Sequence, residues 1–192
     1  MANKDAAFGF RPTRHLSGGL IRAEEMNIAA NYNTAIYNGQ VVEAQAAGGI
    51  EVAAAGDTQM AGVFGGVSYT DPTTSKPTWS NYYPASTNAS DLKATVYTDP
   101  NIIFEAQHDE TGTAAMNFAN LDFVGTSGST INGQSSSEID TSTANASSSA
   151  GGDFKQIGVS TDPDNSDTSS ANCNAYVVFS TGEHIHKLIT AV

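Results

Sequence analysis

Short apolar stretches recur along most of the chain, and Gly, Pro, Asn or Asp separates each from the next. Alternate positions of 61–69 hold Val63, Gly65, Val67 and Tyr69, which is the period of a strand, and the two glycines 65–66 predict a bulge or a close backbone approach. Asn38-Gly39 between apolar residues is a hairpin signal. The pattern predicts an all-β fold of about nine short strands, as a single β-barrel or β-sandwich. The expected strands are 35–42, 49–52, 61–69, 93–98, 102–107, 116–123, 154–159, 175–179 and 184–189.

Two stretches depart from this pattern. The spacing in 22–30 permits one or two helical turns. Residues 125–152 are rich in Ser, Thr and Gly, with Ile131 and Ile139 as the aliphatic side chains, so they predict a long surface loop. A linker between two domains is the less favoured interpretation, because too few apolar residues follow the segment to fold alone.

The N-terminal 22 residues differ from the rest in charge. They carry a net charge of +3, whereas the other 170 residues carry −15. Glycines and a proline interrupt their apolar residues, so no regular element is favoured. We expect residues 1–22 to form an extended docking arm on an all-β body of residues 23–192, with a strand of the chain's own domain as the alternative. The apolar and basic side chains of the expected arm are Phe8, Phe10, Arg11, Arg14, Leu16, Leu20 and Ile21.

The overall charge and composition limit the classes of partner and the kinds of site that we expect. A formal net charge of −12 repels nucleic acid phosphates and anionic membranes, so neither is expected as a partner. The sequence shows no secretory signal and no long apolar run, and we expect a product made in the cytoplasm. A lone cysteine, Cys173, excludes an internal disulfide and predicts a small buried side chain.

Candidate catalytic chemistry is sparse. Asp162, Asp164 and Ser166 resemble the start of a calcium loop, but Asp167 and Cys173 stand where such a loop needs Gly and Glu. On an expected strand, His184 and His186 would share one face near Glu183, and a third zinc ligand could come from His108, Asp109 or Glu110. Nothing in the sequence brings these groups together, so we expect no metal, no cofactor and no enzymatic activity. An aromatic group, Trp79, Tyr82 and Tyr83, could face a ligand or could pin its loop to the body.

Several stretches of residues 6–125 resemble small structural proteins of tailed bacteriophages, common in marine phages, that are read as head decoration or cement proteins. They are Ala6-Ala-Phe-Gly-Phe-Arg-Pro-Thr-Arg-His-Leu-Ser-Gly-Gly, Gly39-Gln-Val-Val, Ala61-Gly-Val-Phe-Gly-Gly-Val-Ser-Tyr-Thr-Asp and Asp99-Pro-Asn-Ile-Ile-Phe-Glu-Ala-Gln-His-Asp-Glu. The resemblance implies a non-enzymatic homotrimer on the outer surface of the capsid, with the major capsid protein as its partner.

In that role the arm would bind neighbouring capsid subunits, and the acidic body would face solvent. Two other classes of function stay open. The aromatic group would suit a glycan- or receptor-binding module of the virion surface. The His and Asp groups would suit a cation-dependent hydrolase.

Overall fold

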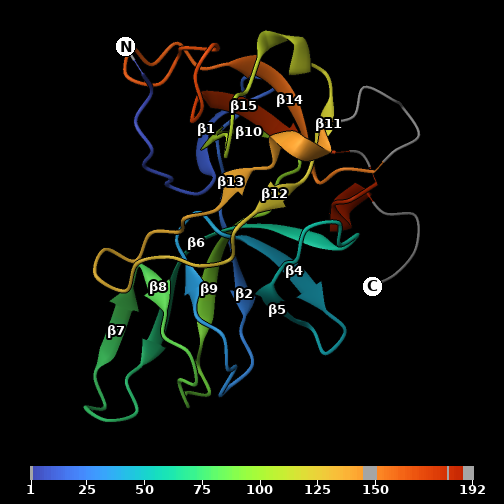
Figure 1. The fold of residues 1–192 in the computed structure, drawn as a ribbon. Helices are drawn as coiled ribbons and strands as arrows, with labels where there is room; N and C mark the ends of the chain where they lie inside the picture. The colour runs from blue at the N-terminus through green and yellow to red at the C-terminus, as the bar shows by residue number, and fades with distance from the viewer. Residues whose placement is uncertain (1, 145–150, 181, 188–192) are drawn as a thin grey trace.

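The computed structural model describes residues 2–144, 151–180 and 182–187, and nearly all regular structure in them is β (Figure 1). Two main antiparallel sheets lie one above the other. The upper sheet has the order β1-β10-β15-β14-β11, and the lower has β2-β9-β6-β4-β5 with β7 also paired to β6. The all-β, sandwich-like class predicted from the sequence is confirmed. The upper strands are β1 (Arg11–His15), β10 (Ile102–Gln107), β15 (Asn174–Phe179), β14 (Phe154–Val159) and β11 (Asn120–Leu121); the lower are β2 (Glu24–Asn27), β9 (Lys93–Tyr97), β6 (Met60–Thr70), β4 (Val41–Gln45), β5 (Gly49–Val52) and β7 (Pro77–Ser80).

Strand β6 is the central strand of the lower sheet, and both of its faces are buried. Met60 and Val63 point to a core shared with the upper sheet, while Ala61, Phe64 and Val67 point to a second core below. Gly65 and Gly66 lie where the register between β6 and β9 shifts, as the sequence predicted. Burial on both faces explains why this stretch is apolar almost throughout.

The upper core is built from alternate residues of the upper strands. Ile102, Phe104 and Ala106 of β10 point into it, whereas Glu105 and Gln107 lie on the opposite face of the sheet. Within the described residues, two small sheets and three short 3₁₀ helices accompany the two main sheets. They are β3 (Ile36–Tyr37) with β8 (Tyr82–Tyr83), β12 (Phe123–Val124) with β13 (Glu138–Ile139), and η1 (Ala114–Met116), η2 (Thr141–Thr143) and η3 (Ile185–Lys187).

Three local expectations are corrected. Asn38-Gly39 forms a turn, in which Gln40 N–H donates to the Tyr37 carbonyl, but the strands on either side of it pair elsewhere, β3 with β8 and β4 with β5 and β6. Residues 24–27 form strand β2, not helical turns, because they pair with β9. Residues 185–187 are a 3₁₀ helix in place of the expected strand, whose remaining positions 188 and 189 lie outside the described residues.

The Ser/Thr-rich stretch is only partly a surface loop. Ile131 is 97% exposed, but Ser135, Ser137 and Ile139 are buried, and Ile139 belongs to the upper core. The Gln134 side chain donates to the Phe8 carbonyl, and Asn38 N–H donates to the Gly133 carbonyl. Residues 133–139 of this stretch therefore pack on the body, while residues 145–150 lie outside the described part of the chain.

Candidate interaction surfaces

Phe10 is a core residue. Its side chain is fully buried, stacks on Phe154 with ring centroids 4.4 Å apart, and meets Phe123 edge-on at 6.3 Å. The backbone at Gly9 has φ of +72°, and a Cβ there would lie 2.6 Å from the Gly39 carbonyl oxygen, so only glycine fits this entry into the core. The expectation that Phe10 contacts a partner is wrong, because its apolar surface is already covered by the chain's own core.

The segment around Phe10 is also held by polar contacts. β1 pairs with β10, and the exposed Arg11 guanidinium binds the buried Glu105 carboxylate at 2.5 Å. Arg11 also lies over the half-buried Phe8 ring. Residues 3–6 bind the C-terminal half of the chain, for example through the Asn3 amide and the Lys4–Asp164 ion pair. Residues 3–15 are therefore part of the body, which was the alternative to an extended docking arm.

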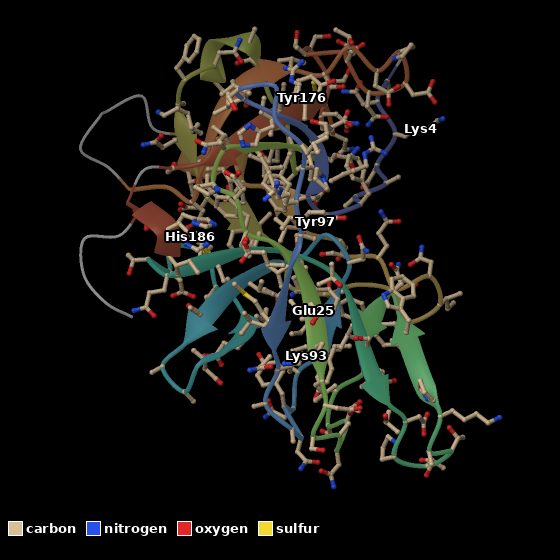
Figure 2. The ribbon with its side chains drawn as sticks, turned by 180° about the vertical axis from the view of Figure 1, so that it is seen from behind. Lys4, Glu25, Lys93, Tyr97, Tyr176 and His186 are labelled. Carbon is tan, nitrogen blue, oxygen red and sulfur yellow. The ribbon has the colours of Figure 1, made fainter. Side chains whose placement is uncertain are left out.

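Most residues from the end of β1 to Arg22 are exposed, and we call Arg14–Arg22 the basic turn. Leu16 is 54% exposed and Leu20 is 83% exposed, while Ile21 packs partly against the upper core. Arg14 and Arg22 are exposed at its two ends, and Arg14 lies over the Tyr176 ring at 5.0 Å. Tyr176 belongs to the upper sheet and is labelled in Figure 2. The basic turn thus presents two aliphatic side chains between two cations on a molecule that is otherwise strongly acidic.

His15 fastens the basic turn to the body. Its Nε2 lies 2.9 Å from Asp99 Oδ2, and its Nδ1 lies 2.9 Å from Ser17 Oγ. The Ser17 backbone N–H also donates to Nδ1 at 3.2 Å, so a backbone donor already shares the lone pair that a general base would need. We read this Ser–His–Asp chain as a turn-stabilising arrangement. Burial tends to raise the pKa of Asp99, but hydrogen bonds from Asn101 and His15 bring it below its usual value.

The structure separates the three aromatic residues that could face a ligand or pin their loop to the body. Tyr83 is fully buried and donates its hydroxyl to the Tyr32 carbonyl at 3.0 Å, so it packs in the lower core, as the second interpretation expects, and does not face a ligand. Tyr82 is half-buried and stacks on Tyr37 at 5.7 Å. Trp79 is 63% exposed and lies on β7, which pairs with β6 (Figure 1).

Trp79 borders a hollow of about 400 Å³ near the tip of the β6–β7 hairpin. Ser68 and Thr70 of β6 line it together with Asp91. Thr70 fixes the Asp91 carboxylate by donating from its hydroxyl at 2.7 Å and from its backbone N–H at 3.1 Å. These bonds hold the pKa of Asp91 below its usual value, so the hollow contains an oriented anionic acceptor beside an exposed aromatic ring.

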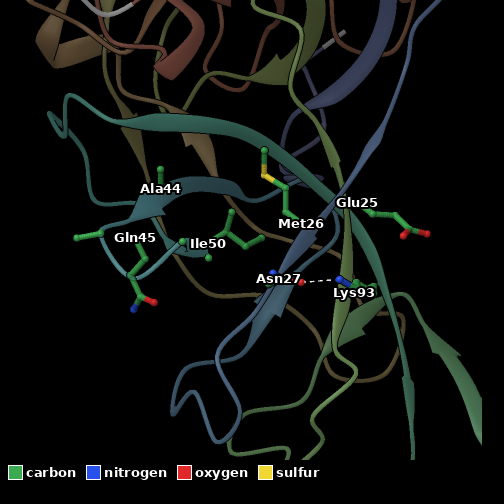
Figure 3. A pocket seen from close by; sticks show the side chains of 10 residues that line it. Glu25, Met26, Asn27, Ala44, Gln45, Ile50 and Lys93 are labelled. Atoms are coloured by element: carbon green, nitrogen blue, oxygen red, sulfur yellow. Dashed lines mark hydrogen bonds between the residues drawn. The ribbon is translucent and has the colours of Figure 1, made fainter. Parts of the chain in front are cut away.

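A second hollow, of about 490 Å³, lies where β2 runs past the β4–β5 hairpin (Figure 3). Met26 and Ile50 give it an apolar part, and Asn27 and Lys93 give it a polar rim. Lys93 Nζ donates to Asn27 Oδ1 at 2.7 Å. No local pattern of residues indicates this hollow, because it depends on how the two edges of the lower sheet approach each other.

The groups considered for metal binding lie apart or have other partners. Buried His108 lies between the Cys173 carbonyl and Gln156 Oε1, each 2.9 Å away, and burial lowers its pKa. The buried His184 ring packs edge-on against Phe179. Asp162 accepts a hydrogen bond from Asp164 N–H within its own turn. Within residues 2–144, 151–180 and 182–187, no three His, Cys, Asp or Glu side chains are grouped to hold a metal ion.

Three carboxyl groups have pKa values raised to about 7. Burial is the main cause for Asp153, Glu43 and Glu138, and neighbouring carboxylates add to it in each case. The Asp153 side chain accepts hydrogen bonds from Gly56 N–H and Phe123 N–H, so it joins the loop at Gly56 to the start of β12. Burial likewise raises the pKa of the Cys173 thiol, and the predicted burial of Cys173 is confirmed.

Comparison with protein-family models, with curated proteins and with solved structures finds no match for the chain. No helix of the described residues is long and apolar enough to cross a membrane.

Proposed function

We propose that the chain is a non-enzymatic decoration, or cement, protein that binds the outer surface of a tailed-phage head and joins neighbouring major capsid subunits. The observation that carries this proposal is the basic turn. It places Leu16 and Leu20, which are exposed, between Arg14 and Arg22 on a body whose remaining charge is strongly negative. Such a patch suits an acidic partner surface that offers apolar holes.

The anchoring of the basic turn makes this contact more favourable than a free arm would be. Ordering a free arm of about 20 residues would cost about 1–2 kcal/mol for each residue in backbone entropy. Burying a leucine side chain returns only about 1.5–3 kcal/mol. Because β1 pairing and the His15–Asp99 contact already order the basic turn, most of that entropic cost is met by folding.

A trimer would strengthen the contact without new residues. Three copies of the basic turn on one oligomer would bind with a high effective concentration after the first had docked. The acidic remainder of each copy would face solvent, where it repels packaged nucleic acid and other virions. We therefore place the protein on the virion exterior, with the major capsid protein as partner.

The test uses purified heads of a phage that encodes the chain. The copy number of the chain in these particles should be comparable to that of the major shell subunit. In sedimentation assays with heads that lack the chain, the double variants Leu16→Ser/Leu20→Ser and Arg14→Glu/Arg22→Glu should bind at least about tenfold more weakly than the unmodified chain. Ile131→Ser is the matched control, because Ile131 is 97% exposed at another loop.

Two results would overturn the proposal. One is absence of the chain from intact particles. The other is unchanged binding of both double variants while circular dichroism shows that they are folded. Deletion of residues 2–21 is not a suitable test, because it would remove Phe10 and β1 from the body.

A further inference from the structure

The outer face of the lower sheet carries a row of directly paired residues from four strands. Ser68 of β6 pairs with Trp79 of β7 on one side and with Lys93 of β9 on the other, and Lys93 pairs with Asn27 of β2. Residues that pair directly across strands point to the same face of a sheet. We call Trp79, Ser68, Lys93 and Asn27 the outer row, and all four are exposed.

The outer row connects the two hollows. Trp79 and Ser68 border the hollow that contains Asp91, and Lys93 and Asn27 border the one beside the β4–β5 hairpin (Figure 3). Glu25 and Lys93, both labelled in Figure 2, lie close together along β2 and β9. Neighbouring strands are about 4.8 Å apart, so the outer row extends about 14 Å. This length exceeds that of one pyranose ring, so it suits a chain of sugar units better than a single one.

Gly66 determines how Trp79 presents its ring. A Cβ at Gly66 would lie 2.8 Å from Trp79 Cζ2, so the indole lies directly against the backbone of β6. The residue is nevertheless 63% exposed, which leaves much of the ring open to solvent. An aromatic ring held against a sheet is a rigid apolar platform that needs little further ordering on binding.

We propose that the outer row is a binding site for a neutral oligosaccharide, with Trp79 stacking on the apolar face of one sugar ring. The Asp91 carboxylate accepts hydrogen bonds from sugar hydroxyls, the Lys93 ammonium donates to them, and Ser68 and Asn27 can do both. A pyranose matches this surface because it presents C–H groups on its faces and hydroxyl groups around its edge.

The charges on this face favour an uncharged ligand. Glu25 borders the same hollow as Lys93, Asp91 borders the other hollow, and the chain as a whole carries a net charge of −12. A nucleic acid strand could also stack on Trp79, but its phosphates would meet net negative charge. The proposal does not depend on the capsid role, because the basic turn contributes none of these residues.

The experiment has two stages and uses the full chain. The protein is first applied to a glycan array that includes neutral hexose and N-acetylhexosamine oligomers. Each retained glycan is then titrated while tryptophan emission is recorded. Trp79 is the sole tryptophan, so its emission reports directly on this site. We expect a saturable change in emission, with longer oligomers binding more tightly than the monosaccharide.

Three variants locate the site. Trp79→Ala removes the platform and should weaken retention by about tenfold or more. Ser68→Ile fills the hollow with a residue that favours strands but keeps Trp79, so its emission should no longer respond to the glycan. Phe118→Ala is the matched control, because Phe118 is an aromatic residue 74% exposed on another part of the surface, and its glycan affinity should be unchanged.

Each outcome decides the proposal. It is supported if emission responds to a retained glycan and both site variants lose the interaction while the control keeps it. It is overturned if no glycan is retained and emission stays constant at millimolar oligosaccharide. It is also overturned if folded Ser68→Ile binds a retained glycan as well as the unmodified chain. Should Trp79→Ala fail to fold, Ser68→Ile alone gives the decision.

Discussion

Replacement of Phe10 by alanine tests whether the start of the chain belongs to the body or is free to bind a partner. The ring is fully buried between Phe154 and Phe123. Removing a buried phenylalanine side chain costs about 3–5 kcal/mol, from lost transfer free energy and the remaining cavity. We therefore expect Phe10→Ala to lower the free energy of unfolding by that amount.

Urea denaturation followed by circular dichroism measures this effect. With an m-value of about 2 kcal/mol/M, a loss of about 4 kcal/mol lowers the unfolding midpoint by about 2 M. Leu20→Ala is the matched control, because Leu20 is 83% exposed and its loss should change stability by less than about 0.5 kcal/mol. An unchanged midpoint for Phe10→Ala would refute the assignment of Phe10 to the core.

Three further predictions concern buried charge and backbone geometry. Burial is the main reason why the pKa of Asp153 is raised from 3.8 to about 7 in the folded protein. The protonated side chain therefore stabilises the fold at low pH, and this stabilisation is lost as the pH rises from about 4 through 7. Asp153→Asn should therefore flatten the fall in melting temperature between pH 5 and pH 8, although Glu43 and Glu138 keep part of the slope. Gly66→Ala should destabilise the fold by about 1 kcal/mol or more and shift tryptophan emission, because φ is +139° and the new Cβ would displace Trp79. Burial tends to raise the pKa of Glu105, but Arg11 and Ser160 hold this pKa below its usual value. The ionised Glu105 carboxylate therefore stabilises the fold above pH 4.5, and this stabilisation is lost as the pH falls. Arg11→Ala should move acid unfolding to higher pH and cost about 1 kcal/mol near neutrality, since Arg11 itself is exposed.

Each of these three predictions would be contradicted by a different result. For Asp153→Asn, the contradicting result is a melting temperature with the same pH dependence as that of the unmodified chain. For Gly66→Ala it is unaltered tryptophan emission together with unaltered stability. For Arg11→Ala it is an acid transition at the original pH, with Thr13→Ala on the same strand as the control.

Local patterns in the sequence were sufficient for most strands of the two main sheets. The predicted ranges 49–52, 102–107 and 154–159 coincide with β5, β10 and β14. The disruption at Gly65-Gly66 was also predictable, because glycine inside a strand often marks a bulge or a close approach. In each case the signal is contained in a few neighbouring residues.

Which strands pair with one another could not be predicted from such local patterns. Asn38-Gly39 specifies a turn, but the strand that each flank joins depends on residues far along the chain. The apolar side chains of residues 8–21 show that a surface must be covered, yet they do not show whose surface. Phe10 covers the chain's own core and Leu20 does not, and this difference depends on where β1 is placed by β10. The outer row could not be predicted from the sequence either, because its four residues are distant in sequence and meet only through strand pairing.

The order of the upper sheet has a consequence for synthesis on the ribosome. Its central strand, β15, follows β1 by more than 150 residues, yet it pairs directly with β10 and thereby supports β1. Strand β1 must therefore wait for β15 to emerge before the upper sheet can close. Until then Phe10 lacks most of its core partners, so a nascent chain is prone to wrong association while β15 is still inside the ribosome.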